Sequence, residues 1–349
     1  MIYTYISICT LLLYLIVARA LKLFSIGKEY ESHELRKIHT GEVTRLGGII
    51  FFSGIILLYF IEEKNIKDLL IFSYLFLIIG LIEDIKKNIS SIIRITILLF
   101  AISFTIYIQQ LTINSFDNYL LNFLFNNFFL SSLIFSIFGL LILINGFNFI
   151  DGLNGLLLGI SSLILITFSF YSYNQLNELY LLTTGIAAIS LIFFYFNFLY
   201  GRILSGDGGS YFLGTLIASI SIFICNQGIL SASAVACVIF YPAMEGMLTV
   251  FRRLVLNASN PMKPDNLHLH QFVFFTLRNA KFTSKLSQNH INSLSSFVII
   301  LSVFIMIVAR DRLSLVLSDF IIFLVFCSIY LLIYLFLFNH IRKLSKNNF

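Results

Sequence analysis

The chain has 349 residues, of which 58% are hydrophobic and 11% are charged, and its mean hydropathy is +0.93. Soluble domains carry about 25% charged residues, so this composition excludes an ordinary soluble protein and predicts an integral membrane protein. The formal net charge of +6 invites a nucleic-acid-binding function. We reject that function because the basic residues follow the membrane topology described below.

Eleven apolar runs follow one another along the chain, and most approach the roughly 20 residues that a membrane-spanning helix needs. Because they show no strand-like alternation, they predict an all-α fold. The first run lacks a basic leader and a small-residue cleavage site, so we expect a retained span. No polar stretch is long enough for a large soluble domain, and residues 1–349 are expected to form one polytopic unit. The runs are 3–24, 46–61, 68–82, 92–110, 129–149, 155–172, 178–199, 209–226, 229–248, 295–309 and 315–338.

Lysine and arginine are distributed unevenly over the loops between these runs. One alternate set of loops carries 17 of them and the opposite set carries four. The positive-inside rule places the first set in the cytoplasm, with the N-terminus periplasmic and the C-terminus cytoplasmic. Loop 249–294 is then the only sizeable cytoplasmic feature, and two C-terminal spans over 295–338 follow it. The first set comprises 25–45, 83–94, 150–154, 200–208, 249–294 and 339–349.

The first polar segment on this cytoplasmic side is the carboxylate pair Glu83-Asp84, followed by Lys86 and Lys87. Adjacent carboxylates raise each other's pKa unless a cation lies nearby. The pair therefore indicates a catalytic base or a cation-binding site, with Lys87 contacting phosphate. A charge cluster at the membrane edge is the alternative.

The second segment carries Asn145, Asn148 and Asp151, which recur every three residues. On a helix they share one arc of about 120°, and polar groups at the end of a span are costly without a function. Gly152 and Gly155 allow the backbone to turn and approach a ligand closely. A polar seam between packed helices is the alternative.

The third segment, 205–210, reads SGDGGS and precedes the run 209–226. A glycine-rich loop before a helix presents backbone N–H groups to anions. Asp207 in such a site would repel phosphate unless a divalent metal bridges them, and Mg²⁺ commonly binds one or two carboxylates plus substrate phosphates. A tight cytoplasmic turn is the alternative.

The fourth segment places Pro242 and Glu245 inside the run 229–248, followed by Arg252 and Arg253. A proline breaks a span, and Glu245 is an ionisable group near membrane depth. The arginine pair is suited to bidentate phosphate binding, although anchoring at the membrane edge explains it equally well.

Two further segments are weaker signals on their own. His268 and His270 lie in the loop 264–271, where they could bind a metal or hydrogen-bond a diphosphate, with no third metal ligand nearby. Arg45 precedes Gly47-Gly48, a combination that also fits a membrane anchor followed by helix packing.

Taken together and in this order, over about residues 39 to 275, these segments resemble the bacterial polyprenyl-phosphate N-acetylhexosamine-1-phosphate transferase family, glycosyltransferase family 4. Ten or eleven transmembrane helices are also typical of that family. The matching residues are Arg45 to Gly48, Glu83, Asp84 and Lys87, Asn145 to Gly155, Gly206 to Ser210, and His268 with His270.

Three positions depart from the family pattern. Glu83 replaces the first Asp of the carboxylate pair, and it keeps the charge. Asn154 replaces an Asp that the family associates with nucleotide recognition, so it keeps hydrogen bonding but loses a charge. Gln271 replaces the last His of the usual histidine loop.

The resemblance implies that the chain transfers a sugar-1-phosphate from a UDP-N-acetylhexosamine to undecaprenyl phosphate in the bacterial inner membrane, releasing UMP. It implies that Asp207 and Asp151 bind Mg²⁺ or Mn²⁺. Members of the family also tend to form homodimers. The implied catalytic residues are Glu83, Asp84, Asp151 and Asp207, and the implied substrate-binding residues are Arg45, Lys87, Asn145, Asn148, Asn154, Arg252, Arg253, His268 and His270.

Two other functions were weighed. The phospho-MurNAc-pentapeptide transferase of peptidoglycan synthesis belongs to the same superfamily, but its loop is richer in histidine than the segment His268–His270. A transporter or lipid flippase also carries intramembrane polar groups, usually near the bilayer midplane and often in repeated halves. Here the polar segments cluster at cytoplasmic span ends and no convincing repeat is present, so we favour the simple-sugar transferase.

Overall fold

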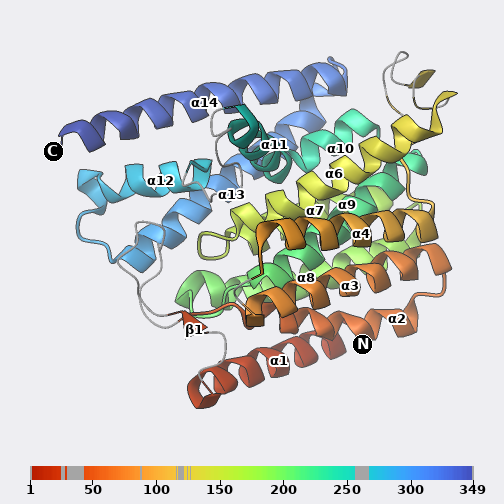
Figure 1. Ribbon diagram of the computed structural model, residues 1–349, viewed down its shortest axis with the longest axis horizontal. Coiled ribbons are helices and arrows are strands. Elements are labelled where there is room, and N and C mark those ends of the chain that lie inside the picture. The colour runs from red at the N-terminus through yellow and green to blue at the C-terminus, as the bar shows by residue number, and fades with distance from the viewer. Residues whose placement is uncertain are drawn as a thin grey trace.

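The computed structural model describes residues 2–24, 28–29, 43–86, 89–114, 116, 122–123, 125, 127–255 and 267–347. Most helices run side by side along the long axis, and the two termini lie toward opposite ends of it (Figure 1). The elements are α1 (Ile2–Phe24), β1 (Lys28–Glu29), β2 (Val43–Thr44), η1 (Leu46–Ile56), α2 (Leu57–Phe60), α3 (Lys64–Lys86), α4 (Ser91–Gln109), α6 (Phe129–Ile150), α7 (Leu156–Ser172), α8 (Asn177–Tyr200), α9 (Gly206–Asn226), α10 (Ala232–Val238), α11 (Phe240–Val255), α12 (Leu269–Arg278), η2 (Lys281–Thr283), α13 (Gln288–Leu313) and α14 (Asp319–Asn347).

The predicted apolar runs fall on helices throughout. Within the described residues, seven helices are long and apolar enough to cross a membrane, and the bent pair α10–α11 makes up to eight. The runs 46–61 and 155–172 correspond to the shorter apolar helices Leu46–Phe60 and Leu156–Ser172, and the run 68–82 lies inside α3. The chain is therefore an all-α integral membrane protein that crosses the membrane several times.

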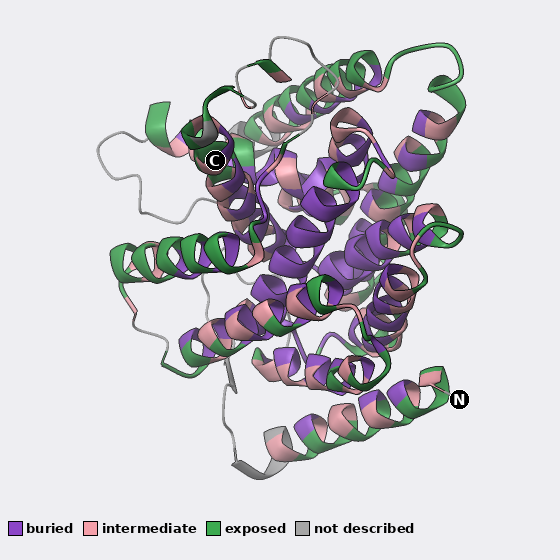
Figure 2. Cartoon of the chain, turned by 90° about the vertical axis from the view of Figure 1, so that its right-hand side faces the viewer, coloured by how far each residue is buried: buried purple, intermediate pink, exposed green. Residues whose placement is uncertain are grey.

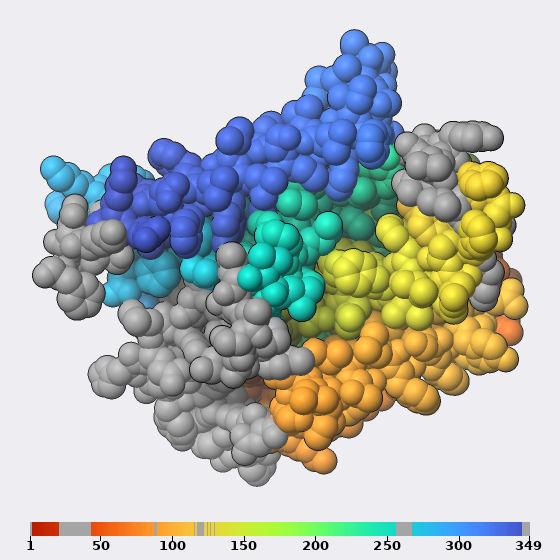
Figure 3. All heavy atoms as spheres, turned by 45° about the horizontal axis from the view of Figure 1, so that its top comes forward, coloured from red at the N-terminus to blue at the C-terminus, as the bar shows by residue number. Residues whose placement is uncertain are grey.

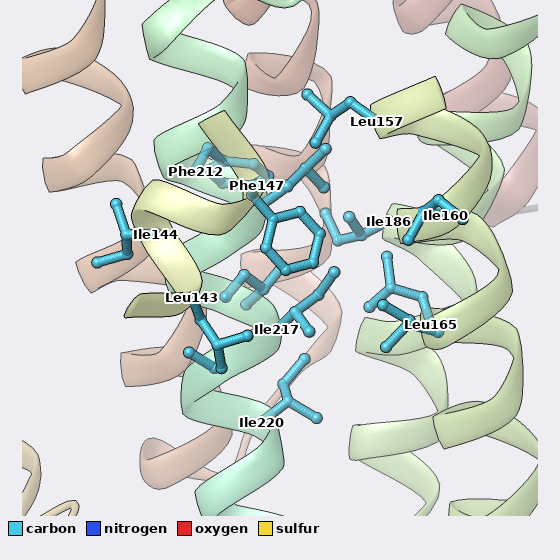
Figure 4. Close-up of a cluster of buried hydrophobic side chains, with 14 of the residues drawn as sticks. Leu143, Ile144, Phe147, Leu157, Ile160, Leu165, Ile186, Phe212, Ile217 and Ile220 are labelled. Atoms are coloured by element: carbon cyan, nitrogen blue, oxygen red, sulfur yellow. The ribbon is translucent and has the colours of Figure 1, made fainter. Parts of the chain in front are cut away.

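Helix α9 forms the centre of the molecule, since its whole apolar stretch is buried. Buried residues concentrate on the inner helices, whereas exposed residues cover the outer faces (Figure 2). Phe147 of α6 packs among side chains of α7, α8 and α9, including Phe212 and Ile217 (Figure 4). Because lipid is as apolar as these side chains, tight packing holds such helices together more than the hydrophobic effect does.

Glycines let α9 approach its neighbours closely. A Cβ on Gly80 of α3 would lie 2.3 Å from the carbonyl oxygen of Asp207, and a Cβ on Gly214 would lie 2.9 Å from Cα of Ile144. Both distances are shorter than real Cβ contacts. The N-terminal turn of α9 is therefore held between α3 and α6 at backbone contact.

The predicted span 229–248 is a sharply broken pair of helices. Helix α10 ends at Val238 and α11 begins at Phe240, with an 86° bend between them. The break agrees with the predicted effect of Pro242: its ring opposes a continuous helix through Val238, four residues earlier, and it lies in the first turn of α11, where a missing N–H costs nothing. Helix α11 crosses α6 at Gly146, where a Cβ would lie 2.1 Å from the Pro242 carbonyl oxygen.

The predicted loop 249–294 is shorter than expected. Helix α11 continues to Val255, and α12, η2 and the first turns of α13 occupy much of the remainder. Within the described part of this stretch, little chain is left as irregular loop. The segment from Leu267 to Gln271, which we call the histidine segment, therefore lies at the start of a helix, with His268 as the N-cap of α12.

Candidate active site

The site is built on the N-terminus of α9. The segment 206–209 forms the first turn of this helix, whereas the sequence predicted a loop before it. Gly206 has φ = +67°, a left-handed conformation that glycine adopts without strain. A Cβ there would lie 2.0 Å from the Arg45 carbonyl oxygen and 2.6 Å from Asp84 Oδ2. The first N–H groups of a helix have no partner within the helix, so they are available to an anion.

Two carboxylates of the protein itself occupy these N–H groups. The backbone N–H groups of Asp207 and Gly208 donate to Oδ1 and Oδ2 of Asp84, at 3.0 and 2.9 Å. The N–H of Gly206 donates to Asp151 Oδ2 at 2.9 Å. The segment thus presents its N–H groups to anions, as the sequence predicted, but the anions are carboxylates of the protein itself. Positive charge at a helix N-terminus attracts any nearby anion, and here the nearest anions are protein side chains.

Asp207 and Glu83 complete a cluster of four carboxylates, which we call the acidic cluster: Glu83, Asp84, Asp151 and Asp207. Asn148 Nδ2 donates to Asp207 Oδ1 at 2.5 Å and to Ser210 Oγ at 3.1 Å. Tyr211 O–H donates to Glu83 Oε2 at 3.0 Å. The structure thus brings together the motifs of α3, the end of α6 and the start of α9, which are far apart in sequence.

The electrostatics of the acidic cluster favour a cation. Burial raises the pKa of Asp151 to about 7, while Arg45 and the Gly206 N–H lower it and Asp207 raises it. Asp207 also repels Glu83 and Asp84. Carboxylates that repel one another in this way lower their energy by sharing a positive charge.

Arg45 is placed beside the acidic cluster by backbone pairing. Thr44 N–H donates to the Arg202 carbonyl at 3.0 Å, and Leu204 N–H donates to the Thr44 carbonyl at 2.8 Å. This short bridge joins the segment before η1 to the segment before α9. Arg45 itself is exposed and attracts the charges of Asp84 and Asp151. Its predicted role in substrate binding stays a prediction.

The histidine segment lies against the turn after α6. The ring of His268 is 5.3 Å from that of Phe149 and 5.4 Å from that of His270, with the two imidazoles nearly parallel. His270 Nε2 lies 2.6 Å from where a Cβ of Gly152 would be. Burial lowers the pKa of His270 to about 3, with a further lowering by His268 and an opposing effect of Glu245. His270 is therefore a neutral packing residue at pH 7.

The two arginines of α11 have different surroundings. Arg253 stacks its guanidinium over the ring of Phe149, at 5.3 Å from the centroid, and so lies beside the end of α6. Arg252 is 5% exposed, and it donates to Tyr334 O–H at 3.1 Å and to Thr249 Oγ1 at 3.2 Å. Arg253 is thus the arginine that the structure places nearer the site, while Arg252 joins α11 to α14.

Two predicted substrate-binding asparagines make other contacts. Asn145 Nδ2 donates to the Leu141 carbonyl of its own helix at 2.8 Å. Asn154 is fully buried; its N–H donates to Asn292 Oδ1 at 2.6 Å and its Nδ2 donates to Asn289 Oδ1 at 2.7 Å. Asn154, one of the three positions that depart from the family pattern, therefore joins the turn after α6 to α13. Lys87 lies outside the described residues.

Several contacts of the site were not predicted from the sequence. Tyr211 follows Asp207 by four residues, the spacing that places two side chains on one helix face. The sequence therefore already indicated that Tyr211 lies beside the carboxylates. Tyr330 and Tyr334 of α14 contact Glu245 and the histidine segment. They lie in a run without any motif, so nothing in the local sequence marks them.

Comparison with known proteins agrees with this arrangement. The model of glycosyl transferase family 4 matches residues 67–225, a range that contains all four carboxylates of the acidic cluster. The chain is 26% identical over 246 residues to the probable undecaprenyl-phosphate N-acetylglucosaminyl 1-phosphate transferase of Bacillus subtilis (strain 168). The aligned part covers 67% of this chain and 66% of that relative. Over residues 67–225, where the motifs of the acidic cluster gather at one site, the chain is therefore similar to glycosyl transferase family 4.

Proposed function

We propose that the protein transfers N-acetylhexosamine-1-phosphate from a UDP-sugar to undecaprenyl phosphate in the bacterial inner membrane. UDP-N-acetylglucosamine is the first donor to test, because the Bacillus subtilis relative is named for that sugar. The single observation that carries the proposal is a juxtaposition. Four carboxylates from α3, the turn after α6 and the start of α9 converge at one helix N-terminus, within the range that the family model matches.

The apolar cavity lies between α6, α9, α10, α11 and α14 and has a volume of about 360 Å³. These helices meet on the face of the molecule shown in Figure 3, with α6 in yellow, α10–α11 in teal and α14 in blue. The cavity lining is almost entirely apolar and includes Leu143 and Met247. On α9 the cavity is lined by residues from Ala218 to Cys225, toward the end of that helix opposite to Asp207. Its apolar lining suits the distal part of a long isoprenoid chain, so we propose that it holds that part and not the phosphate.

The proposed reaction is a displacement at phosphorus. An oxygen of the lipid phosphate forms a bond to the phosphorus that carries the sugar, and the bond from that phosphorus to the bridging oxygen breaks. UMP leaves with the electron pair, and one diphosphate bond replaces another. Because both substrates are anionic, the main task of the protein is to place them and offset their charge.

The acidic cluster offers hard oxygen donors of the type that Mg²⁺ prefers. Among the described residues, no group of three or more His, Cys, Asp or Glu side chains could hold a metal ion by itself. Mg²⁺ commonly binds one or two carboxylates together with substrate phosphates. We propose Asp207 and Asp151 as its ligands, held by Asn148 and the Gly206 N–H. When bound, Mg²⁺ would neutralise charge on the diphosphate and the leaving UMP.

The remaining residues have proposed roles that follow from their contacts. Asp84 accepts two backbone N–H groups of α9, so it fixes the turn that carries Asp207. A lipid phosphate is already largely ionised near pH 7, and a strong base is then unnecessary. We therefore propose Asp84 as a positioning carboxylate. Arg253, Arg45 and His268 border the cluster and would contact the phosphates.

The test is UMP release by the purified protein with undecaprenyl phosphate, UDP-N-acetylglucosamine and Mg²⁺. We expect release that requires both the lipid and the metal and that disappears when EDTA is added. A protein that stays folded yet releases no UMP from any UDP-N-acetylhexosamine would refute the proposal. Release without the lipid would instead indicate hydrolysis of the sugar nucleotide.

A further inference from the structure

The histidine segment is held by a buried carboxylate that the proposed reaction does not use. Glu245 of α11 is 0% exposed. Its Oε2 accepts the Nδ1 hydrogen of His268 at 3.0 Å. Its Oε1 accepts the N–H of Leu269 and the O–H of Tyr330, each at 3.0 Å. A buried charge is tolerated when hydrogen bonds surround it in this way.

Helix α14 holds the same segment from a second side. Tyr334 O–H donates to the Leu267 carbonyl at 2.8 Å, and Arg252 donates to Tyr334 at 3.1 Å. Tyr330 and Tyr334 are four residues apart and share one face of α14. Displacing His268 would therefore break contacts with both α11 and α14, so its ring is held in one orientation.

On the side away from Glu245, His268 contacts the proposed active site. Its ring lies 5.3 Å from the Phe149 ring, two residues before Asp151. Its neighbour His270 packs on Gly152, directly after Asp151. His268 thus stands between the Glu245 carboxylate and the turn that carries a carboxylate of the acidic cluster.

The hydrogen of the Glu245–His268 bond can be assigned chemically. An ionised carboxylate only accepts hydrogen bonds, so the hydrogen belongs to His268 Nδ1. Nε2, on the other edge of the ring, is then the nitrogen that can exchange a proton or bond with a substrate. A carboxylate on Nδ1 also stabilises the imidazolium that forms when Nε2 is protonated as well.

We propose that Glu245 is a positioning residue of the transferase: it holds His268 in the Nδ1-protonated form so that Nε2 meets a phosphate of the substrates. The inference rests on the proposed function. The step involves one proton, which moves between Nε2 of His268 and a phosphate oxygen or stays shared in a hydrogen bond between them.

The variant Glu245→Gln tests this directly. The amide keeps the size of the side chain, and its oxygen can still accept from Leu269 and Tyr330. Its NH₂ group would face His268 Nδ1 and would force that nitrogen to accept, so the proton moves to Nε2. We expect kcat to fall about 10²-fold, in the range of a lost electrostatic contact, with KM for the UDP-sugar changed by less than about threefold.

The control variant is Thr249→Val. Thr249 lies on the same buried face of α11, and it bonds to the Glu245 carbonyl and to Arg252 rather than to the described residues of the histidine segment. If Glu245 acted only by joining α11 to α14, Thr249→Val and Glu245→Gln would lower kcat alike. We expect kcat of Thr249→Val within about threefold of the wild type, a difference below about 1 kcal/mol in activation free energy.

The second readout is independent of turnover. Nitrogen NMR of ¹⁵N-histidine-labelled full-length protein in detergent reports which ring nitrogen carries the proton, and His268→Asn assigns the signal. We expect Nδ1 protonation of His268 in the wild type and Nε2 protonation in Glu245→Gln. We also expect Glu245→Gln combined with His268→Asn to be no slower than His268→Asn alone.

Three results would overturn the inference. They are an unchanged tautomer in Glu245→Gln, a kcat loss matched by Thr249→Val, and additive losses in the double variant. A different outcome is that Glu245→Gln changes the tautomer of His268 while the wild type turns over no UDP-N-acetylhexosamine. The failure would then lie in the proposed function. That outcome would leave the Glu245–His268 pairing established but would refute its role in transfer.

Discussion

Two buried ionic clusters of this molecule differ in how completely their charges are paired. The arginine cluster, formed by Arg310, Asp311, Asp319 and Tyr171, is closed. Arg310 donates to both carboxylate oxygens of Asp319 at 2.8 Å, and its NH1 donates to Tyr171 O–H at 3.0 Å and to Asp311 at 3.1 Å. It joins α7, α13 and α14, and nothing in its geometry calls for a ligand.

The acidic cluster is open by comparison. Its four carboxylates share backbone N–H groups and side-chain donors, and among the described residues Arg45 and Arg94 oppose their charge. An excess of negative charge is costly in a membrane protein without a task. The unbalanced acidic cluster, and not the stronger ion pair of the arginine cluster, is therefore the proposed functional site.

The largest expected effect is loss of activity on changing Asp207→Asn. Removing one charge from the acidic cluster should relieve repulsion, so we expect no loss of thermal stability, while kcat falls at least about 10³-fold because a proposed metal ligand is lost. UMP release and thermal unfolding in detergent measure the two quantities. A variant that retains a tenth of the wild-type activity would show that Asp207 is not essential.

The reverse pattern is expected in the arginine cluster. Changing Arg310→Met leaves the half-buried Asp319 without its charge partner, which costs about 1.5–3 kcal/mol. We expect a lower unfolding temperature and wild-type UMP release per folded molecule. Equal losses of activity in Arg310→Met and Asp207→Asn would erase the distinction between the two clusters.

A smaller effect is expected from moving the acidic cluster without altering its charge. In Gly80→Ala the new methyl group would lie 2.3 Å from the Asp207 carbonyl oxygen, and overpacking of this kind costs about 1–3 kcal/mol. The first turn of α9 must shift, so we expect reduced stability and reduced activity together. Gly185→Ala is the matched control, because its new methyl group would lie 2.6 Å from the Leu57 side chain and would not touch the acidic cluster. We expect it to lower stability without the same loss of activity, and equal activity losses in both variants would contradict the account.

The smallest effect is expected for His270, the neutral histidine that packs beside the acidic cluster. His270 has a folded pKa of about 3, against an ordinary value of 6.5, so the unfolded chain binds more protons between these values. Its contribution to stability is present above pH 6.5 and is lost as the pH falls toward 3. Relative to His270→Leu, the wild type should lose up to about 2 kcal/mol between pH 7.5 and 5. If the free energies of unfolding of the wild type and of His270→Leu changed equally with pH, His270 would not be buried in its neutral form.

The sequence predicted the fold and the acidic cluster well, because both depend on local signals. Apolar runs specify helices, and Glu83, Asp151 and Asp207 each lie in a short polar segment at a helix end. The unpredicted features depend on contacts between distant segments. That the first-turn N–H groups of α9 bind Asp84, that Asn154 faces α13, and that Tyr330 holds Glu245 follow from packing, which no local pattern encodes.

The most direct test of the central claim follows the β-phosphate of the donor. UDP-N-acetylglucosamine labelled with ³²P at the β-phosphate would be incubated with the purified protein, undecaprenyl phosphate and Mg²⁺, and the lipid would be extracted. The account predicts that label enters the lipid fraction while unlabelled UMP is released, and that neither occurs with Asp207→Asn. Label that remains in water as UDP, with sugar alone on the lipid, would contradict sugar-1-phosphate transfer.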